Sequence, residues 1–194
     1  MWRFNGLVLL TGYLQRFYVH ERVRQMLGDG GPETRLKDLA GMIDVVTELV
    51  RQTEADRRVP ANAAEAVRPI ILRLREWVAD YQPQPRAEVS TAEMVATVAG
   101  VIYAEGHVNR GIIQMGELFD SELADRYRQL APAHQSNAAA VNTAVAQVAR
   151  QEPIEESLRL QMETWYEQAR ASREKVISDI EAVAVMLEGE SPAT

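Results

Sequence analysis

The sequence predicts an all-α fold, a helical bundle of about six helices, on three observations. Apolar residues recur at spacings of three and four along most of the 194 residues, which is the period of a helix. No stretch shows the alternation of apolar and polar residues that a half-buried strand requires. Prolines and glycines fall mostly between the periodic stretches, where they end helices. With 46% hydrophobic residues, the chain is apolar enough to form a packed core.

Three helices are expected before a proline-rich break at residues 82–85. The first spans about residues 5–27 and ends at a glycine-rich turn. The second spans about residues 32–58, where apolar residues keep a strict spacing of three and four. The third starts near Asn62, because Asn62 and Glu65 have the spacing of a capping box.

Three more helices are expected after the break, and the fourth and the sixth are long. Ser90, with Glu93 three residues later, has the pattern that begins a helix, and we expect this fourth helix to continue to Leu130. The fifth spans about residues 132–151, and the sixth spans about residues 153–187.

The break divides the chain into two three-helix halves. The N-terminal half covers residues 1–82, the C-terminal half covers residues 86–188, and a short tail follows at residues 189–194. Pro83 and Pro85 predict an exposed connection between the halves, because proline removes a helical hydrogen bond and restricts the residue before it. One compact domain built from both halves stays open as the alternative, since the length of the chain suits a single domain.

Charge and cysteine content exclude several classes of function. The formal net charge of −7 argues against a nucleic-acid partner, because phosphate binding needs clustered cations. The chain has no cysteine, so disulfides, thiolate metal sites and cysteine nucleophiles are excluded. The apolar run near the N-terminus is too short for a signal peptide or a transmembrane helix. We therefore expect a cytoplasmic protein, or one that sits within an assembled particle.

The N-terminal segment combines positive charge with aromatic residues. Before Asp29, four arginines oppose a single glutamate. A basic amphipathic helix of this kind docks on a partner protein or, less favourably here, on an anionic membrane. The interpretation that the pattern favours is that this helix is the first of the bundle and packs through a stripe of Leu7, Leu10, Leu14 and Phe17. Five aromatic residues are the candidate docking residues: Trp2, Phe4, Tyr13, Phe17 and Tyr18.

Glu105 is the candidate buried polar site. A lone buried carboxylate is costly, so a fourth helix that is continuous through Gly106 predicts an arginine partner from another helix. The alternatives are an acid/base or ligand-anchoring group, or an exposed side chain at a helix break. The prediction rests on an apolar seam with spacings of four and three that places Glu105 among Met94, Val98, Val101, Val108, Ile112, Met115 and Phe119.

Four glycines lie along the same expected helix, at Gly100, Gly106, Gly111 and Gly116. Each costs about 1 kcal/mol relative to alanine in a helix interior. Several in one helix therefore indicate close packing against a neighbouring helix, a kink or a mobile region. The pattern alone leaves these three alternatives open.

No catalytic residue, metal site or cofactor is expected. The three histidines, His20, His107 and His134, lie on separate segments and lack the spacing of a helical metal site. The sequence contains no phosphate-binding loop, no dinucleotide-binding glycine pattern and no serine–histidine–aspartate motif.

The expected function is that of a non-enzymatic helical assembly or adaptor subunit that contacts a protein partner or further copies of itself. A larger complex or a virion-type particle is the expected setting. The first alternative is an enzyme or small-molecule sensor with a pocket around Glu105. The second alternative is a nucleic-acid-associated subunit that uses the basic N-terminal helix.

Overall fold

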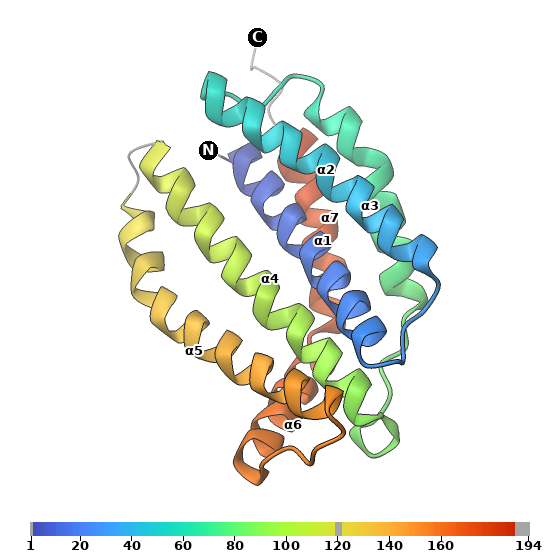
Figure 1. Cartoon of the computed structure of the whole chain (residues 1–194). Coiled ribbons are helices and arrows are strands. Elements are labelled where there is room, and N and C mark those ends of the chain that lie inside the picture. Colours follow the sequence, from blue (N-terminus) through green and yellow to red (C-terminus); the bar gives the residue numbers. More distant parts are fainter. Residues whose placement is uncertain (1, 119–121, 189–194) are drawn as a thin grey trace.

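The computed structural model describes residues 2–118 and 122–188, and this part of the chain is all-helical (Figure 1). The predicted fold class is therefore confirmed. A single turn of 3-10 helix, η1 (Arg86–Glu88), follows the proline-rich connection. The described α-helices are α1 (Trp2–Met26), α2 (Glu33–Asp56), α3 (Ala63–Asp80), α4 (Thr91–Leu118), α5 (Leu123–Ala149), α6 (Glu156–Ala171) and α7 (Arg173–Glu188).

The first helix, α1, lies at the centre of the bundle. It packs against α4 on one side and against α2 and α7 on the other (Figure 1). Its apolar stripe is fully buried at Leu7, Leu10 and Leu14, as the spacing of these residues predicts. They form the first core cluster with apolar residues of α2, α3 and α7, including Leu39, Leu74 and Ile180.

A second core cluster joins α4, α5 and α6 to the end of α1. Val98 and Ile102 of α4 pack there with Val141 of α5 and Met162 of α6. The two clusters do not follow the order of the chain, because α7 comes last in the sequence yet packs beside α1 and α3 (Figure 1). The structure thus mixes helices from before and after the proline-rich connection.

Three helix boundaries differ from the sequence prediction. The fourth helix ends at Leu118 and not at Leu130, and Pro132 lies inside α5. The physical reason is a helical hairpin in which Gly116 packs so closely on Ala124 that a Cβ at Gly116 would lie 2.5 Å from the alanine Cβ. The expected sixth helix is divided at Ser172, where α7 turns away to pack on α1 and α3.

Several local predictions are tested by hydrogen bonds. The connection at residues 82–85 is non-helical, as the prolines predict. The backbone N–H of Glu93 donates to Ser90 Oγ at 3.0 Å, which confirms that helix start. The capping box at Asn62 is wrong, because the Asn62 side chain makes no capping hydrogen bond. Its φ of −84° and ψ of 3° lie outside the extended region from which a capping side chain reaches back.

Close packing joins α1 to α4, and three glycines permit it. A Cβ at Gly100 would collide with the backbone carbonyl oxygen of Arg16, and one at Gly12 would collide with Val108. A Cβ at Gly111 would lie 2.8 Å from Val8. Of the three alternatives that the glycines left open, close packing is therefore the right one at Gly100 and Gly111.

Gly106 differs from the other glycines of α4. A Cβ there would meet nothing nearer than a guanidinium nitrogen of Arg110 at 3.9 Å.

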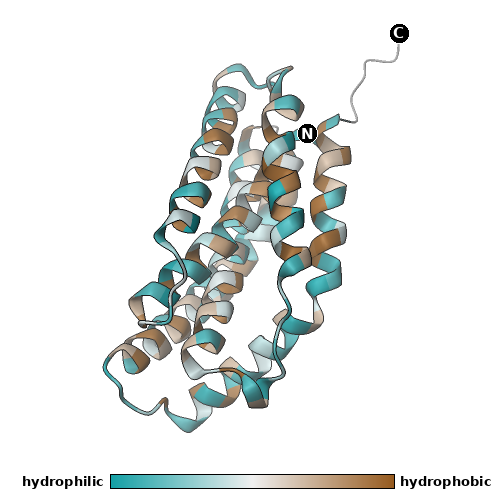
Figure 2. Cartoon of the chain, turned by 90° about the vertical axis from the view of Figure 1, so that its right-hand side faces the viewer, coloured by the Kyte–Doolittle hydropathy of each residue, from teal (hydrophilic) through white to brown (hydrophobic). Residues whose placement is uncertain are grey.

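Figure 2 shows apolar and polar residues alternating around the helices, with no continuous apolar span. None of the helices in residues 2–118 and 122–188 has both the length and the apolar character needed to cross a bilayer.

Candidate ligand-binding pocket

The predicted N-terminal docking residues belong to the bundle. Phe4 is 2% exposed, and Tyr13, Phe17 and Tyr18 are half-buried against the first core cluster. Trp2 lies in α1, and its side chain is outside the described structure. The interpretation of these aromatic residues as a free docking face is therefore wrong for the four described side chains, because α1 is covered by neighbouring helices.

Glu105 is exposed, although α4 runs without a break through Gly106. The prediction of a substantially buried carboxylate with an arginine partner is therefore wrong. Because α1 and α5 both pack on α4, the helix buries residues on two sides. The predicted seam is buried near its ends, at Met94, Val98 and Met115, but its middle is less covered and Glu105 is exposed there. Within residues 2–118 and 122–188, no hydrogen bond or ion pair reaches Glu105. Partial desolvation still raises the pKa of this carboxylate, while the charges of His134 and Arg16 oppose the shift.

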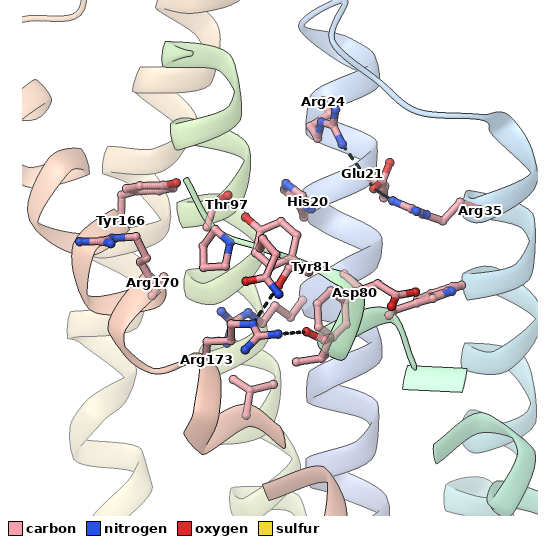
Figure 3. Close-up of a pocket in the computed structure, with 18 of the residues that line it drawn as sticks. His20, Glu21, Arg24, Arg35, Asp80, Tyr81, Thr97, Tyr166, Arg170 and Arg173 are labelled. Atoms are coloured by element: carbon pink, nitrogen blue, oxygen red, sulfur yellow. Dashed lines mark hydrogen bonds and ion pairs between the residues drawn. The ribbon is translucent and has the colours of Figure 1, made fainter. Parts of the chain in front are cut away.

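The structure places a cavity elsewhere, along the part of α1 that runs from Arg16 to Arg24, and Thr97 of α4 also lines it. The cavity has a volume of about 300 Å³ and lies between α1, the C-terminal end of α3 and the junction of α6 with α7 (Figure 3). Tyr81 and the first two residues of the proline-rich connection, Gln82 and Pro83, form one of its walls. This volume is at the small end of the range for ligand pockets.

Aromatic and aliphatic side chains form most of the cavity wall. Phe17, Tyr81 and Tyr166 line it together with Leu39 and Val176. Burial raises the pKa of Tyr166 to about 12, so its hydroxyl stays protonated at neutral pH and donates to the backbone oxygen of Gln84 at 2.9 Å. This hydrogen bond holds the connection against α6.

Tyr81 and Trp77 complete the aromatic wall. The Tyr81 ring meets the His20 ring edge to face, with centroids 6.4 Å apart. Burial raises the pKa of Tyr81, so its hydroxyl is also a neutral group at physiological pH. Two guanidinium groups make cation–π contacts with the Trp77 ring, that of Arg35 at 5.7 Å and that of Arg73 at 5.2 Å from the ring centroid.

Five arginines also line the cavity, and two of them, Arg24 and Arg35, pair with the carboxylates of Glu21 and Glu93. Glu21, which is 3% exposed, accepts from Arg35 at 2.8 Å and lies 3.6 Å from Arg24 (Figure 3). Arg24 also pairs with Glu93 at 3.0 Å, and His20 shares the same carboxylate at 2.9 Å. Desolvation raises the pKa of Glu93, but His20 and Arg24 outweigh it, so the net shift is downward.

Two further arginines of the cavity are also matched. Arg170 pairs with Glu167 at 2.7 Å, one turn earlier in α6. Arg173 donates to the carbonyl oxygens of Val78 at 3.0 Å, Ala79 at 2.8 Å and Tyr81 at 2.8 Å. Arg173 thus caps the C-terminal end of α3, where those carbonyls have no partner within the helix.

Arg16 is the exception among these arginines. In the described part of the chain, its guanidinium makes no hydrogen bond and no ion pair, although it lines the cavity. Burial lowers the pKa of Arg16, and Tyr13, Tyr81 and Glu105 oppose the shift from beyond ion-pair distance. The backbone of Arg16 is held in place because its carbonyl oxygen packs on Gly100 of α4.

Sequence reasoning missed this site because its residues come from positions between 16 and 176. One signal was available in α1: Arg16, His20 and Arg24 recur at a spacing of four, which places three basic side chains on one face of the helix. That stripe lies on a helix that also carries a full apolar stripe. A basic face on a core helix is the pattern that could have identified the cavity.

Comparison with models of known protein families, with curated proteins and with solved structures found no match. Among the described residues, no group of three or more histidine, aspartate or glutamate side chains is arranged to hold a metal ion. The expected role as an assembly subunit stays a prediction, and the covered α1 helix removes the docking arm on which it partly rested.

Proposed function

We propose that this protein binds a small anionic ligand with an apolar body in the cavity beside α1. One observation supports the proposal: Arg16 lines the cavity without an acceptor in the described structure, whereas Arg24, Arg35, Arg170 and Arg173 each have one. The ligand would supply the missing acceptor. This corresponds to the small-molecule sensor alternative, with the pocket centred on Arg16 in place of Glu105.

An unpaired charge that is partly shielded from water has a free-energy cost. Arg16 is half-buried, and a cation that has lost part of its water is stabilised when a counter-charge or hydrogen-bond acceptors replace that water. Arg16 cannot retreat toward solvent by moving its helix, because its backbone is closely packed on Gly100. A charged group kept in an unsatisfied state is characteristic of binding sites, where the ligand completes the hydrogen bonding.

The apolar walls define the rest of the ligand. Phe17, Leu39 and Val176 cannot hydrogen-bond through their side chains, so they favour a ligand whose body is apolar. An ion surrounded by water, such as free chloride, would leave these walls unoccupied. The cavity therefore suits an anionic group attached to a compact apolar body.

The test is calorimetric titration with 2-naphthalenesulfonate, an aromatic monoanion, into the wild-type protein and two variants. A charge-assisted hydrogen bond contributes about 1.5–3 kcal/mol, so Arg16→Gln should raise the Kd at least roughly tenfold. Arg22→Gln is the matched control, because Arg22 is an exposed arginine of the same helix that does not line the cavity. Equal affinities of the wild-type protein and Arg16→Gln would refute the proposal.

The stability of the unliganded protein gives a second readout. Arg16 is half-buried and unpaired in the described structure, so Arg16→Met should not destabilise the protein without ligand and should raise the free energy of unfolding by less than about 1 kcal/mol. An arginine that serves the fold alone would show the opposite sign. Urea unfolding of the wild type and Arg16→Met measures this difference, and a loss of stability in Arg16→Met would count against a binding role.

A further inference from the structure

We infer that the ligand of this cavity is an aromatic monocarboxylate and that phosphates are excluded. This inference rests on the proposed function and specifies the chemical class of the ligand at the same site. Three features of the cavity carry it: the number of unmatched charges, the nature of the unmatched group, and the rings in the wall.

The first feature is the charge that remains after the protein's own pairs are counted. Arg24 and Arg35 are committed to Glu21 and Glu93, and Arg170 is committed to Glu167. Arg16 alone among the cavity arginines is left to compensate a ligand charge in the described structure. One available cation matches one negative charge.

A second negative charge would have unfavourable neighbours. The Asp80 carboxylate lines the same cavity, whereas the charge of Glu21 is already balanced by Arg24 and Arg35. The C-terminal carbonyls of α3 also lie there, and Arg173 is already used to cap them. A phosphate dianion would place its second charge near these groups without a cation of its own, and like charges at close range are repelled.

The second feature is the geometry of the unmatched group. A guanidinium is planar and presents parallel N–H donors that match the two oxygens of a carboxylate. Phosphate sites typically add backbone N–H donors from a glycine-rich loop. The loop that borders this cavity contains Gln82 and Pro83 instead, and proline has no N–H to donate.

The third feature is the set of rings around the space. Phe17, Tyr81 and Tyr166 present aromatic surfaces from α1, the connection and α6. Aromatic pairs gain stability beyond the area that they bury, so these rings favour a flat aromatic body over a flexible alkyl chain. The volume of about 300 Å³ limits that body to a small ring system.

The experiment compares four ligands by calorimetry at pH 8. Three share one ring system: 2-naphthoate, 2-naphthyl phosphate and the neutral 2-naphthamide. The fourth, decanoate, has the carboxylate without the ring. We expect 2-naphthoate to bind at least tenfold more tightly than each of the others to the wild-type protein and to Arg22→Gln. In Arg16→Gln its advantage over 2-naphthamide should disappear.

Other outcomes would contradict either the inference about the ligand class or the proposed function itself. If 2-naphthyl phosphate binds as tightly as 2-naphthoate and depends on Arg16, the inference fails while the proposed function stands. The same holds if decanoate binds as tightly as 2-naphthoate. If 2-naphthamide matches 2-naphthoate, the anion is irrelevant and the inference fails. If no anion shows a dependence on Arg16, the proposed function fails as well.

Discussion

The two sides of α1 differ in the space that they leave. Toward α4, Gly100 and Gly111 let the two backbones approach until no further side-chain atom fits. Toward α3 and the α6–α7 junction, the same helix borders a cavity of about 300 Å³. Helices come close where a glycine of one faces the other, as at Gly100 and Gly111, and they stand apart where long side chains such as Arg35 lie between them.

This difference shows how one helix can serve both the fold and a binding site. The glycine side fixes the position of α1, because the backbone at Arg16 rests directly on Gly100. The cavity side then presents the Arg16 guanidinium from a backbone that cannot shift. A rigid support of this kind is what a binding group requires.

Adding a side-chain atom at Gly100, where α4 packs on α1, should have the largest effect on stability. In Gly100→Ala the new Cβ collides with the carbonyl oxygen of Arg16, which is backbone and cannot rotate away. Overpacking of this kind costs about 2 kcal/mol in the free energy of unfolding, even after the better helix propensity of alanine is counted. Urea unfolding measures the loss, and 2-naphthoate binding should weaken because Arg16 is displaced.

Gly106→Ala is the control for that prediction. A Cβ at Gly106 meets only the end of the Arg110 side chain at 3.9 Å, so the alanine should stabilise the helix by roughly 0.5–1 kcal/mol. The two glycines are six positions apart in α4 and should give opposite signs. Equal effects at both positions would remove the distinction between a closed side and an open one.

On the cavity side, the raised pKa of Tyr166 predicts that the free energy of unfolding depends on pH. Its pKa of about 12 in the folded protein exceeds the ordinary value near 10, so the unfolded chain releases this proton first as the pH rises. The free energy of unfolding should therefore fall between about pH 10 and pH 12. Tyr166→Phe should lose about 1 kcal/mol at pH 8 with the hydrogen bond to Gln84, and then decline less steeply with pH.

Urea midpoints of the wild type and Tyr166→Phe at pH 8, 10 and 12 measure both effects. Tyr13 and Tyr81 also have raised pKa values, so a part of the alkaline loss should remain in the variant. Parallel declines of the two proteins would show that the Tyr166 hydroxyl does not hold the connection against α6.

The smallest effect is expected at Glu105, on the edge of α4. Because the side chain is exposed and unpaired in the described structure, Glu105→Gln and Glu105→Ala should each change the free energy of unfolding by less than about 0.5 kcal/mol at pH 7. The raised pKa of Glu105 means that folding disfavours its ionised form, so Glu105→Gln should not destabilise. A loss above about 2 kcal/mol would point to the buried, paired carboxylate that the apolar seam predicts.

The sequence predicts the α1 stripe well because Leu7, Leu10 and Leu14 share one face of a helix, which is a local property. It predicts the start of α4 for the same reason, since Ser90 caps the N–H of Glu93 three residues away. It misplaces the end of α4, because no proline marks that end and the close contact of Gly116 with Ala124 exists only in the tertiary structure. It also treats α6 and α7 as one helix, because their periodic pattern hardly changes at Ser172.

What the sequence by itself determined is therefore the helical class, the core face of α1 and the break at residues 82–85. Each depends on residues within a few turns of one another. Tertiary structure alone decided that α1 is central, that Glu105 is exposed and that Arg16 lines one cavity with Tyr81 and Tyr166. The exposure and pairing of a side chain depend on how many helices pack against the helix that carries it. The periodicity along one helix does not reveal how many neighbouring helices there are.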